Sequence, residues 1–170
     1  MDRYPFAEVE AKITERITEL GGRPHLNLYK TLANEPTMLK AWVEFAYSLR
    51  LAAKTPRILR ELMILRTAQL QNSAYEWHQH RFMAKEVGVS EHQIADLAMW
   101  PSSDSFSPKE KAALALTEAI VQGEVSEETH KLAAAHFSTD EMIELVMTAS
   151  FYTMVPRVLA ALDVQIEKEE

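Results

Sequence analysis

Two glutamates and a histidine have the residue types and spacing that proton transfer requires. Glu76 and His80 are four residues apart, so on a helix they share one face, whereas His78 points about 200° away from them. Glu61 lies in the mostly apolar run 60–66, which is expected to be buried. A buried charge usually has an ion-pair partner or a functional role. Neighbouring carboxylates raise the pKa of a histidine. Burial and the mutual repulsion of two carboxylates can also raise the pKa of one of the two carboxyl groups. The pattern predicts that His80 carries a proton and that Glu76 and Glu61 tune it.

The same residues also fit a structural role. Ser73 followed three positions later by Glu76 has the pattern of a capping box, which satisfies the start of a helix. Glu76 and His80 would then form an ordinary surface pair worth roughly 0.3 kcal/mol. Other conspicuous side chains are expected in the core or at the surface: Trp77, Met83, His25, His92, His130 and His136. Spacing alone leaves both interpretations open.

Helix start and stop signals predict an all-α protein, an antiparallel bundle of seven to nine helices. Serine, threonine and proline mark the starts and glycine marks several stops, with no alternating strand pattern. The expected helices cover residues 6–20, 36–53, 56–71, 74–87, 90–100 and 107–123, and begin again at residues 126 and 138. Pro156 should kink or break the last helix.

The short break at residues 72–73 folds the predicted helices on either side of it into an antiparallel hairpin. Counted from this turn at about 1.5 Å per residue, Glu61 lies only about 6 Å further along than His80. We therefore expect Glu61 to meet Glu76 and His80 between the two helices.

Composition limits the classes of function. The chain has 170 residues, 47% of them hydrophobic, and a net charge of −7, which disfavours nucleic-acid binding. It has no cysteine, which excludes disulfides, thiolate zinc sites, iron–sulfur clusters and thiol catalysis, and neither a metal site nor a cofactor is predicted. The N-terminus lacks a signal-peptide pattern, and the most apolar stretch, residues 145–156, is too short to span a bilayer. We expect a cytoplasmic protein that binds no membrane.

The sequence resembles the carboxymuconolactone decarboxylase and alkylhydroperoxidase D superfamily. The segments that carry the resemblance are residues 61–66, 73–80 and 84–90, with residues 154–157 in the place of a further recurrent segment. The similarity implies a helical domain of the alkylhydroperoxidase D-like type over residues 28–166. A helical extension over residues 1–27 would precede this domain, and a solvated tail over residues 167–170 would follow it.

The peroxidase branch of this superfamily has a Cys-x-x-Cys pair at the head of one helix. A glutamate lies on the preceding helix, and a histidine follows the second cysteine by four residues. Glu61 matches this glutamate and His80 matches this histidine, but Ser73 and Glu76 stand where the two cysteines would be. Because the thiolate is the chemical agent in peroxide reduction, the sequence contradicts a thiol peroxidase. A family-level peroxiredoxin or antioxidant label finds no support in it.

The decarboxylase branch lacks the cysteine pair and keeps the spacing of Glu76 and His80. This resemblance implies lyase or isomerase chemistry, without a cofactor, on a small carboxylated lactone or organic acid. Such a reaction returns a proton to carbon, and the anionic substrate calls for a cation. The expected substrate-binding residues are Arg66, Arg81, Ser73, Tyr75 and Trp77, with Arg157 a weaker candidate.

A second hypothesis is a non-catalytic or regulatory homo-oligomer that kept the fold after losing the thiols. The position of Glu61 inside an apolar helix favours the enzyme. In either case we expect a dimer, trimer or hexamer, because the chain has more apolar surface than one small bundle hides. The residues behind this expectation are Met63, Leu65, Leu145, Val146, Phe151 and Met154.

Overall fold

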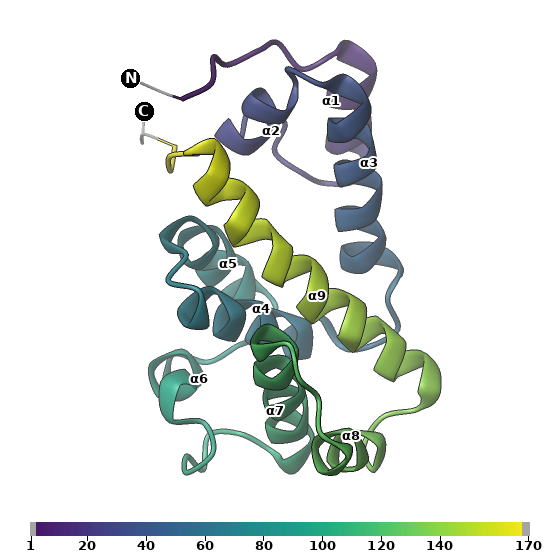
Figure 1. Cartoon of the computed structure of the whole chain (residues 1–170), viewed down its shortest axis with the longest axis vertical. Coiled ribbons are helices and arrows are strands. Elements are labelled where there is room, and N and C mark those ends of the chain that lie inside the picture. Colours follow the sequence, from purple (N-terminus) through teal and green to yellow (C-terminus); the bar gives the residue numbers. More distant parts are fainter. Residues whose placement is uncertain (1–2, 168–170) are drawn as a thin grey trace. The chain divides into compact units, whose positions relative to one another are not determined.

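The computed structural model describes residues 3–167, and all regular structure within them is helical (Figure 1). The α-helices are α1 (Ala11–Glu19), α2 (Asn27–Leu32), α3 (Pro36–Tyr47), α4 (Arg57–Leu70), α5 (Ala74–Glu86), α6 (Glu91–Asp96), α7 (Pro108–Gln122), α8 (Glu127–Ala134) and α9 (Thr139–Leu162). A π-helical turn, Ser48–Ala52, follows α3, and a 3-10 turn, Leu97–Met99, follows α6. Over the described range, the structure confirms the all-α prediction and the expected number of helices.

The predicted helix ends agree best where a side chain or a glycine completes the end. Serine hydroxyls accept a backbone N–H at the starts of α5, α6, α7 and α8, from Ser73, Ser90, Ser107 and Ser126. α7 stops at Gly123, whose φ of 88° lies in the left-handed region that glycine adopts without strain. These ends depend on local chemistry, which is why the sequence predicts them.

Three features of the N-terminal part differ from the sequence-based expectation. α1 begins later than predicted, at Ala11, and the predicted continuation of α3 is the π-helical turn from Ser48. α2 was not predicted, because no side chain caps it locally; the N–H of Asn27 instead donates to Oε1 of Glu167 at 2.6 Å. Glu167 belongs to the predicted solvated tail, and residues 168–170 of that tail lie outside the described residues.

Pro156 does not break α9, contrary to one of the two outcomes expected from sequence. A proline inside a helix costs about 3 kcal/mol, because it removes one hydrogen bond and crowds the preceding turn. Val155 and Leu159, on either side of it, are both buried. We infer that packing of these side chains offsets the cost.

The described chain forms two compact units: residues up to 52 with those from 157 onward, and residues 53–156. The first unit contains α1, α2, α3 and the end of α9. In it, a Cβ at Gly22 would lie 1.6 Å from the Tyr47 hydroxyl oxygen, so this close approach requires glycine. The domain boundaries predicted at residues 27 and 166 stay a prediction.

The second unit contains α4 to α8 and the first part of α9, and α4 lies between its two apolar cores. Met63 and Leu145 belong to a core that joins α4, α7, α8 and α9. Leu62 and Leu65 belong to another that joins α4 to α5, α6 and α7. Because α4 is packed on both sides, Glu61 is enclosed as its sequence context predicts.

α9 is the one helix within residues 3–167 that is long and apolar enough to cross a membrane, by length and composition alone. The core helix of a soluble domain passes the same test. Leu145, Ala149 and Val155 are almost fully buried, which favours a core helix.

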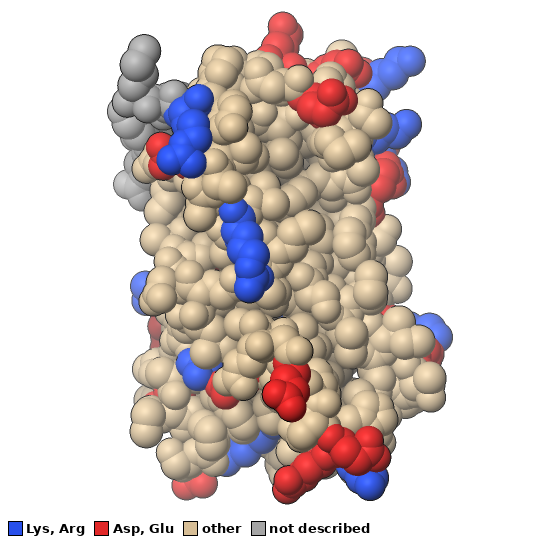
Figure 2. Space-filling model, viewed as in Figure 1, with Lys and Arg blue, Asp and Glu red and all other residues tan. Residues whose placement is uncertain are grey.

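Charged side chains of both signs are mixed on the face that Figure 2 draws. Lys and Arg side chains stand singly or beside Asp and Glu rather than in one basic patch. This face gives no sign of the electrostatic footprint that nucleic-acid-binding proteins carry. The expectation that the chain binds no nucleic acid stays a prediction.

Candidate active site

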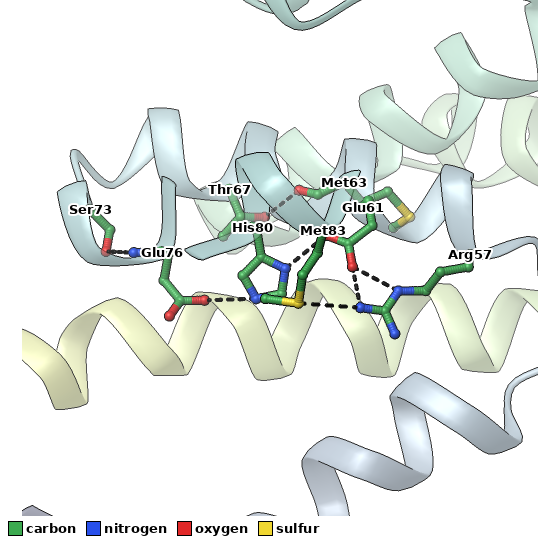
Figure 3. Close-up of polar contacts among 8 residues, drawn as sticks. All are labelled: Arg57, Glu61, Met63, Thr67, Ser73, Glu76, His80 and Met83. Atoms are coloured by element: carbon green, nitrogen blue, oxygen red, sulfur yellow. Dashed lines mark hydrogen bonds and ion pairs between the residues drawn. The ribbon is translucent and has the colours of Figure 1, made fainter. Parts of the chain in front are cut away.

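Two helices of the second unit carry a line of four polar side chains, which we call the acid–base cluster (Figure 3). Arg57 and Glu61 come from α4, and Glu76 and His80 come from α5. The chain reverses between these helices at Asn72, whose φ of 52° is left-handed. The hairpin expected from sequence therefore forms and aligns the two pairs of side chains.

Glu61 lies at the centre of the acid–base cluster. Its Oε2 is 2.8 Å from Nδ1 of His80, and its Oε1 accepts hydrogen bonds from Nε of Arg57 at 2.7 Å and from a terminal N–H of the same guanidinium. On the other side of the ring, Nε2 of His80 lies 3.6 Å from Oε2 of Glu76. Glu61, Glu76 and His80 are 0%, 5% and 6% exposed. The structure thus brings together the three residues that the sequence nominates.

Ser73 and Glu76 complete only half of a capping box. The Ser73 hydroxyl accepts the backbone N–H of Glu76 at 3.4 Å, as a helix N-cap does. The backbone N–H of Ser73 donates to the carbonyl of Ala68 at 2.9 Å rather than to the Glu76 carboxyl group. The structural interpretation is therefore right for Ser73, whereas the Glu76 side chain faces His80.

α9 supplies a further contact to the acid–base cluster. The ring of Tyr152 meets the ring of His80 edge to face, with centroids 4.9 Å apart. Beside it on α9, the carbonyl of Thr153 accepts a hydrogen bond from Nε2 of Gln71 at 3.1 Å, which ties the end of α4 to α9. These contacts enclose His80, and electrostatic interactions strengthen where water is excluded.

The charges on Glu61 and His80 stabilise each other. Burial raises the pKa of Glu61, but His80 and then Arg57 outweigh it, so this pKa lies below its usual value. Burial lowers the pKa of His80, but Glu61 and, to a smaller extent, Glu76 outweigh it and raise this pKa. The carboxylate form of Glu61 and the imidazolium form of His80 therefore favour each other.

The pKa of Glu76 is shifted in the opposite direction from that of Glu61. Burial, with a contribution from Glu61, raises its pKa although His80 acts against this. Its Oε2 is buried and has no hydrogen-bond partner within residues 3–167. A carboxyl group in such surroundings favours its neutral form. When His80 is protonated and Glu76 is neutral, the acid–base cluster has one excess positive charge.

The two arginines expected to bind substrate have partners elsewhere. Arg66 donates from Nε to Oε1 of Glu118 at 2.7 Å. Arg81 is exposed, and its guanidinium lies 4.0 Å from the Glu91 carboxylate. The structure does not bring either guanidinium into the acid–base cluster.

The remaining predicted binding residues have packing roles or lie in the other unit. Tyr75 is buried, and Trp77 packs against the apolar core that includes Leu62. Arg157 belongs to the first unit and is exposed there. Ser73 is hydrogen-bonded to a cluster residue, through the backbone N–H of Glu76.

Sequence reasoning missed Arg57 and Tyr152. Arg57 precedes Glu61 by four residues, and this spacing on a helix was a usable signal for an ion pair. Tyr152 comes from α9, more than 70 residues after His80, and no local pattern links the two.

No group of three or more His, Cys, Asp or Glu side chains is arranged to hold a metal ion in the part of the chain that the structure describes. Both ring nitrogens of His80 face carboxyl groups instead. The expectation of a site without metal or cofactor stays a prediction.

Comparison with known proteins places the cluster inside a recognised family segment. Residues 36–119 match the model of the carboxymuconolactone decarboxylase family, and this segment includes α4 and α5. YdfG, an uncharacterized protein of Bacillus subtilis strain 168, is 32% identical over 94 residues, which are 54% of this chain and 64% of YdfG. The chain therefore spans less than two thirds of this curated relative.

Solved structures show the same fold at low sequence identity. A peroxidase-related protein of Ralstonia eutropha JMP134 with an alkylhydroperoxidase AhpD core has a TM-score of 0.83 at 19% identity, covering 98% of this chain and 93% of that one. The debrominase Bmp8, as a variant bound to 2,3,4-tribromopyrrole, has a TM-score of 0.79 at 18% identity, covering 98% and 94%. Residues 36–119 are thus similar to the carboxymuconolactone decarboxylase family, and the described chain has an AhpD-like helical fold, in a sequence without cysteine.

Proposed function

We propose that this chain is an acid–base enzyme that works without a cofactor on a small carboxylated lactone or organic acid, as a decarboxylating lyase or an isomerase. The observation that supports the proposal is the buried pair of His80 and Glu76, in which the carboxyl Oε2 beside Nε2 has no hydrogen-bond partner within residues 3–167. A proton held between His80 and Glu76 can be transferred to a bound substrate. A cytoplasmic setting is part of the proposal.

The chemistry needs only a proton and the groups that hold it. In decarboxylation, the bond between carbon and the carboxylate breaks, CO₂ leaves, and the electron pair stays on carbon. A proton from the His80–Glu76 pair then forms the new C–H bond, and water restores the proton to the pair. In isomerisation, the imidazole of His80 in its neutral form removes a proton from one carbon and returns it to another. Neither route requires a thiol, an oxidant or a reductant.

The charge of the acid–base cluster supports an anionic substrate. Its one excess positive charge, in surroundings with little water, is balanced by one carboxylate. The complex of the debrominase Bmp8 with 2,3,4-tribromopyrrole supports a small ring as a ligand of this fold. Because Ser73 and Glu76 occupy the positions of the peroxidase cysteines, peroxide reduction by thiols is not part of the proposal.

We also propose that the chain forms a homo-oligomer, although the residues that motivate this differ from those named from sequence. Met63, Leu65, Leu145 and Phe151 are buried and cannot form the contact. Val146 and Met154 are exposed, and on α9 they are joined by Ile143 and Met147. Exposed apolar side chains at helical spacing favour association. Light scattering at micromolar concentration tests this, and a monomer would contradict it.

The enzymatic proposal is tested by hydrogen exchange at carbon. Small unsaturated lactone carboxylates and related acids are incubated with the protein in D₂O, and NMR follows C–H loss, C–D gain and CO₂ release. We expect at least one compound to exchange or decarboxylate with the unmodified protein. His80→Gln should abolish this reaction, because the imidazole supplies the proton.

Two outcomes would contradict the proposal that the chain is an enzyme. One is that no compound in the panel reacts, which favours the non-catalytic homo-oligomer. The other is a reaction whose rate is the same in His80→Gln, which places the chemistry elsewhere. Lys85→Met is the matched control: it changes an exposed residue of α5 that is paired with Glu91, so it should react as the unmodified protein does.

A further inference from the structure

We propose that Arg57 is a positioning residue that holds the Glu61 carboxylate against Nδ1 of His80, so that Nε2 is the nitrogen that exchanges its proton. The inference rests on the proposed function of the same site, because it names the nitrogen that serves the substrate. Arg57 acts through Glu61 rather than by touching the reacting atoms.

The geometry fixes both oxygens of Glu61. Oε1 accepts two N–H groups of Arg57, and Oε2 lies 2.8 Å from Nδ1 of His80. The pairing of two N–H donors of one guanidinium with a carboxylate gives directional as well as electrostatic restraint. Because Glu61 is fully buried, bulk solvent does not compete with these partners, and the carboxyl plane is set from both sides.

This arrangement selects the protonated nitrogen of His80. An ionised carboxylate can only accept hydrogen bonds, so Nδ1 carries the N–H that it donates to Glu61 in both charge states of the ring. The proton that comes and goes is therefore on Nε2. That nitrogen faces Oε2 of Glu76, which has no hydrogen-bond partner in the described chain. The exchangeable proton thus lies between His80 and Glu76.

Arg57 also keeps this proton releasable. The groups that face His80 are Glu61 and Arg57 from α4, Glu76 from its own helix, and the Tyr152 ring from α9. The two carboxyl groups raise the pKa of His80, whereas the positive charge of Arg57 lowers it. Without Arg57, the imidazolium would hold its proton more tightly.

A structural role alone predicts something different. An Arg57 that only stabilised α4 would still place its positive charge near His80, so its removal would shift the pKa of His80 in either case. It would not decide which ring nitrogen is protonated in the neutral form. The ring-nitrogen shifts of the neutral form therefore separate the two roles.

The experiment is an NMR titration of the histidine ring nitrogens in ¹⁵N-labelled protein. The unmodified protein, Arg57→Lys and Arg57→Met are compared, with Lys85→Met as a control for loss of a positive charge on the exposed face of α5. We expect Arg57→Met to raise the pKa of His80 by about one pH unit and to reveal a neutral form protonated on Nε2. Arg57→Lys keeps the charge but loses the paired donors, so the pKa of His80 should change less in it than in Arg57→Met. The control should titrate like the unmodified protein.

The result that overturns the inference is a neutral ring of His80 that is still protonated on Nδ1 in Arg57→Met, whatever its pKa. If this variant does not fold, Arg57→Gln lacks the charge and the paired donors, and the same change of protonated nitrogen is expected of it. The outcome is separable from that of the exchange assay. A change of protonated nitrogen without any reaction contradicts the enzyme alone, and a reaction that needs His80 with an unchanged nitrogen contradicts the role of Arg57 alone.

Discussion

α4 carries an arginine–glutamate pair near each of its ends, and the two pairs are built differently. Near the start, Arg57 meets Glu61, which is fully buried and also contacts His80. Near the end, Arg66 meets Glu118 of α7 at 2.7 Å, in a setting where both side chains keep some exposure. We call this second set, Arg66, Glu118 and their hydrogen-bonded neighbours Trp100 and Gln69, the structural network.

The difference lies in which partners can change their protonation. Glu118 accepts from the guanidinium of Arg66 and, at 2.7 Å, from the indole N–H of Trp100, and neither donor loses a proton near neutral pH. The structural network therefore fastens α4 to α7 and to the 3-10 turn before Trp100. The acid–base cluster instead contains an imidazole between two carboxyl groups. We propose that similar ion pairs thus serve packing in one region and proton transfer in the other.

The largest expected effect is on activity at His80. His80→Gln should lower the rate of the reaction found in the exchange assay by about two to four orders of magnitude, because the proton carrier is lost. Circular dichroism should show that the helices remain. Equal rates in His80→Gln and the unmodified protein would remove the functional distinction between the two regions.

A second effect is on the pH dependence of stability. The pKa of Glu76 is raised in the folded state, so the unfolded chain loses this proton first as the pH rises. Stability due to this group is therefore lost as the pH rises above about 4.5 and through the folded-state pKa. Glu76→Gln lacks this loss, so the difference between its free energy of unfolding and that of the unmodified protein should increase as the pH rises from about 4.5 through the folded-state pKa of Glu76. Parallel profiles from denaturant titrations would contradict a buried, neutral Glu76.

A smaller effect is expected in the structural network. Glu118→Gln weakens the hydrogen bonds to Arg66 and Trp100 and should lower the free energy of unfolding by about 1 kcal/mol. The exchange reaction and the titration of His80 should not change. A shift in that titration would show that the two regions of α4 are coupled.

The smallest effect is expected at His78. It lies on another face of α5, with its ring against that of Phe82 at 5.5 Å. His78→Gln should leave the rate of exchange within about a factor of two of the unmodified protein, because it removes no member of the acid–base cluster. If neither His78→Gln nor His80→Gln changed the rate of exchange, the assignment of the acid–base cluster would be wrong. The helix-capping role of Ser73 would then be the preferred interpretation of this segment.

Local chemistry explains what could be predicted from the sequence. The shared face of Glu76 and His80, the cap at Ser73 and the hairpin turn all depend on residues within a few positions of one another. The side chain of Arg66 could not be assigned in this way, because its partner Glu118 comes from a helix beyond the hairpin. The contact of Tyr152 with His80 and the capping of α2 by Glu167 likewise join distant parts of the chain. Such contacts follow from packing, which leaves no short pattern.

The most direct test of the acid–base cluster is the sign of the shift in the pKa of His80 in the unmodified protein. Burial lowers this pKa and the flanking carboxyl groups raise it, so the two influences predict opposite results. NMR titration of the six histidines, with the His80 signal identified by its loss in His80→Gln, measures the sign. We predict a pKa above the usual value of about 6.5. A pKa below that value would contradict the account, because it would mean that Glu61 and Glu76 do not govern the proton on His80.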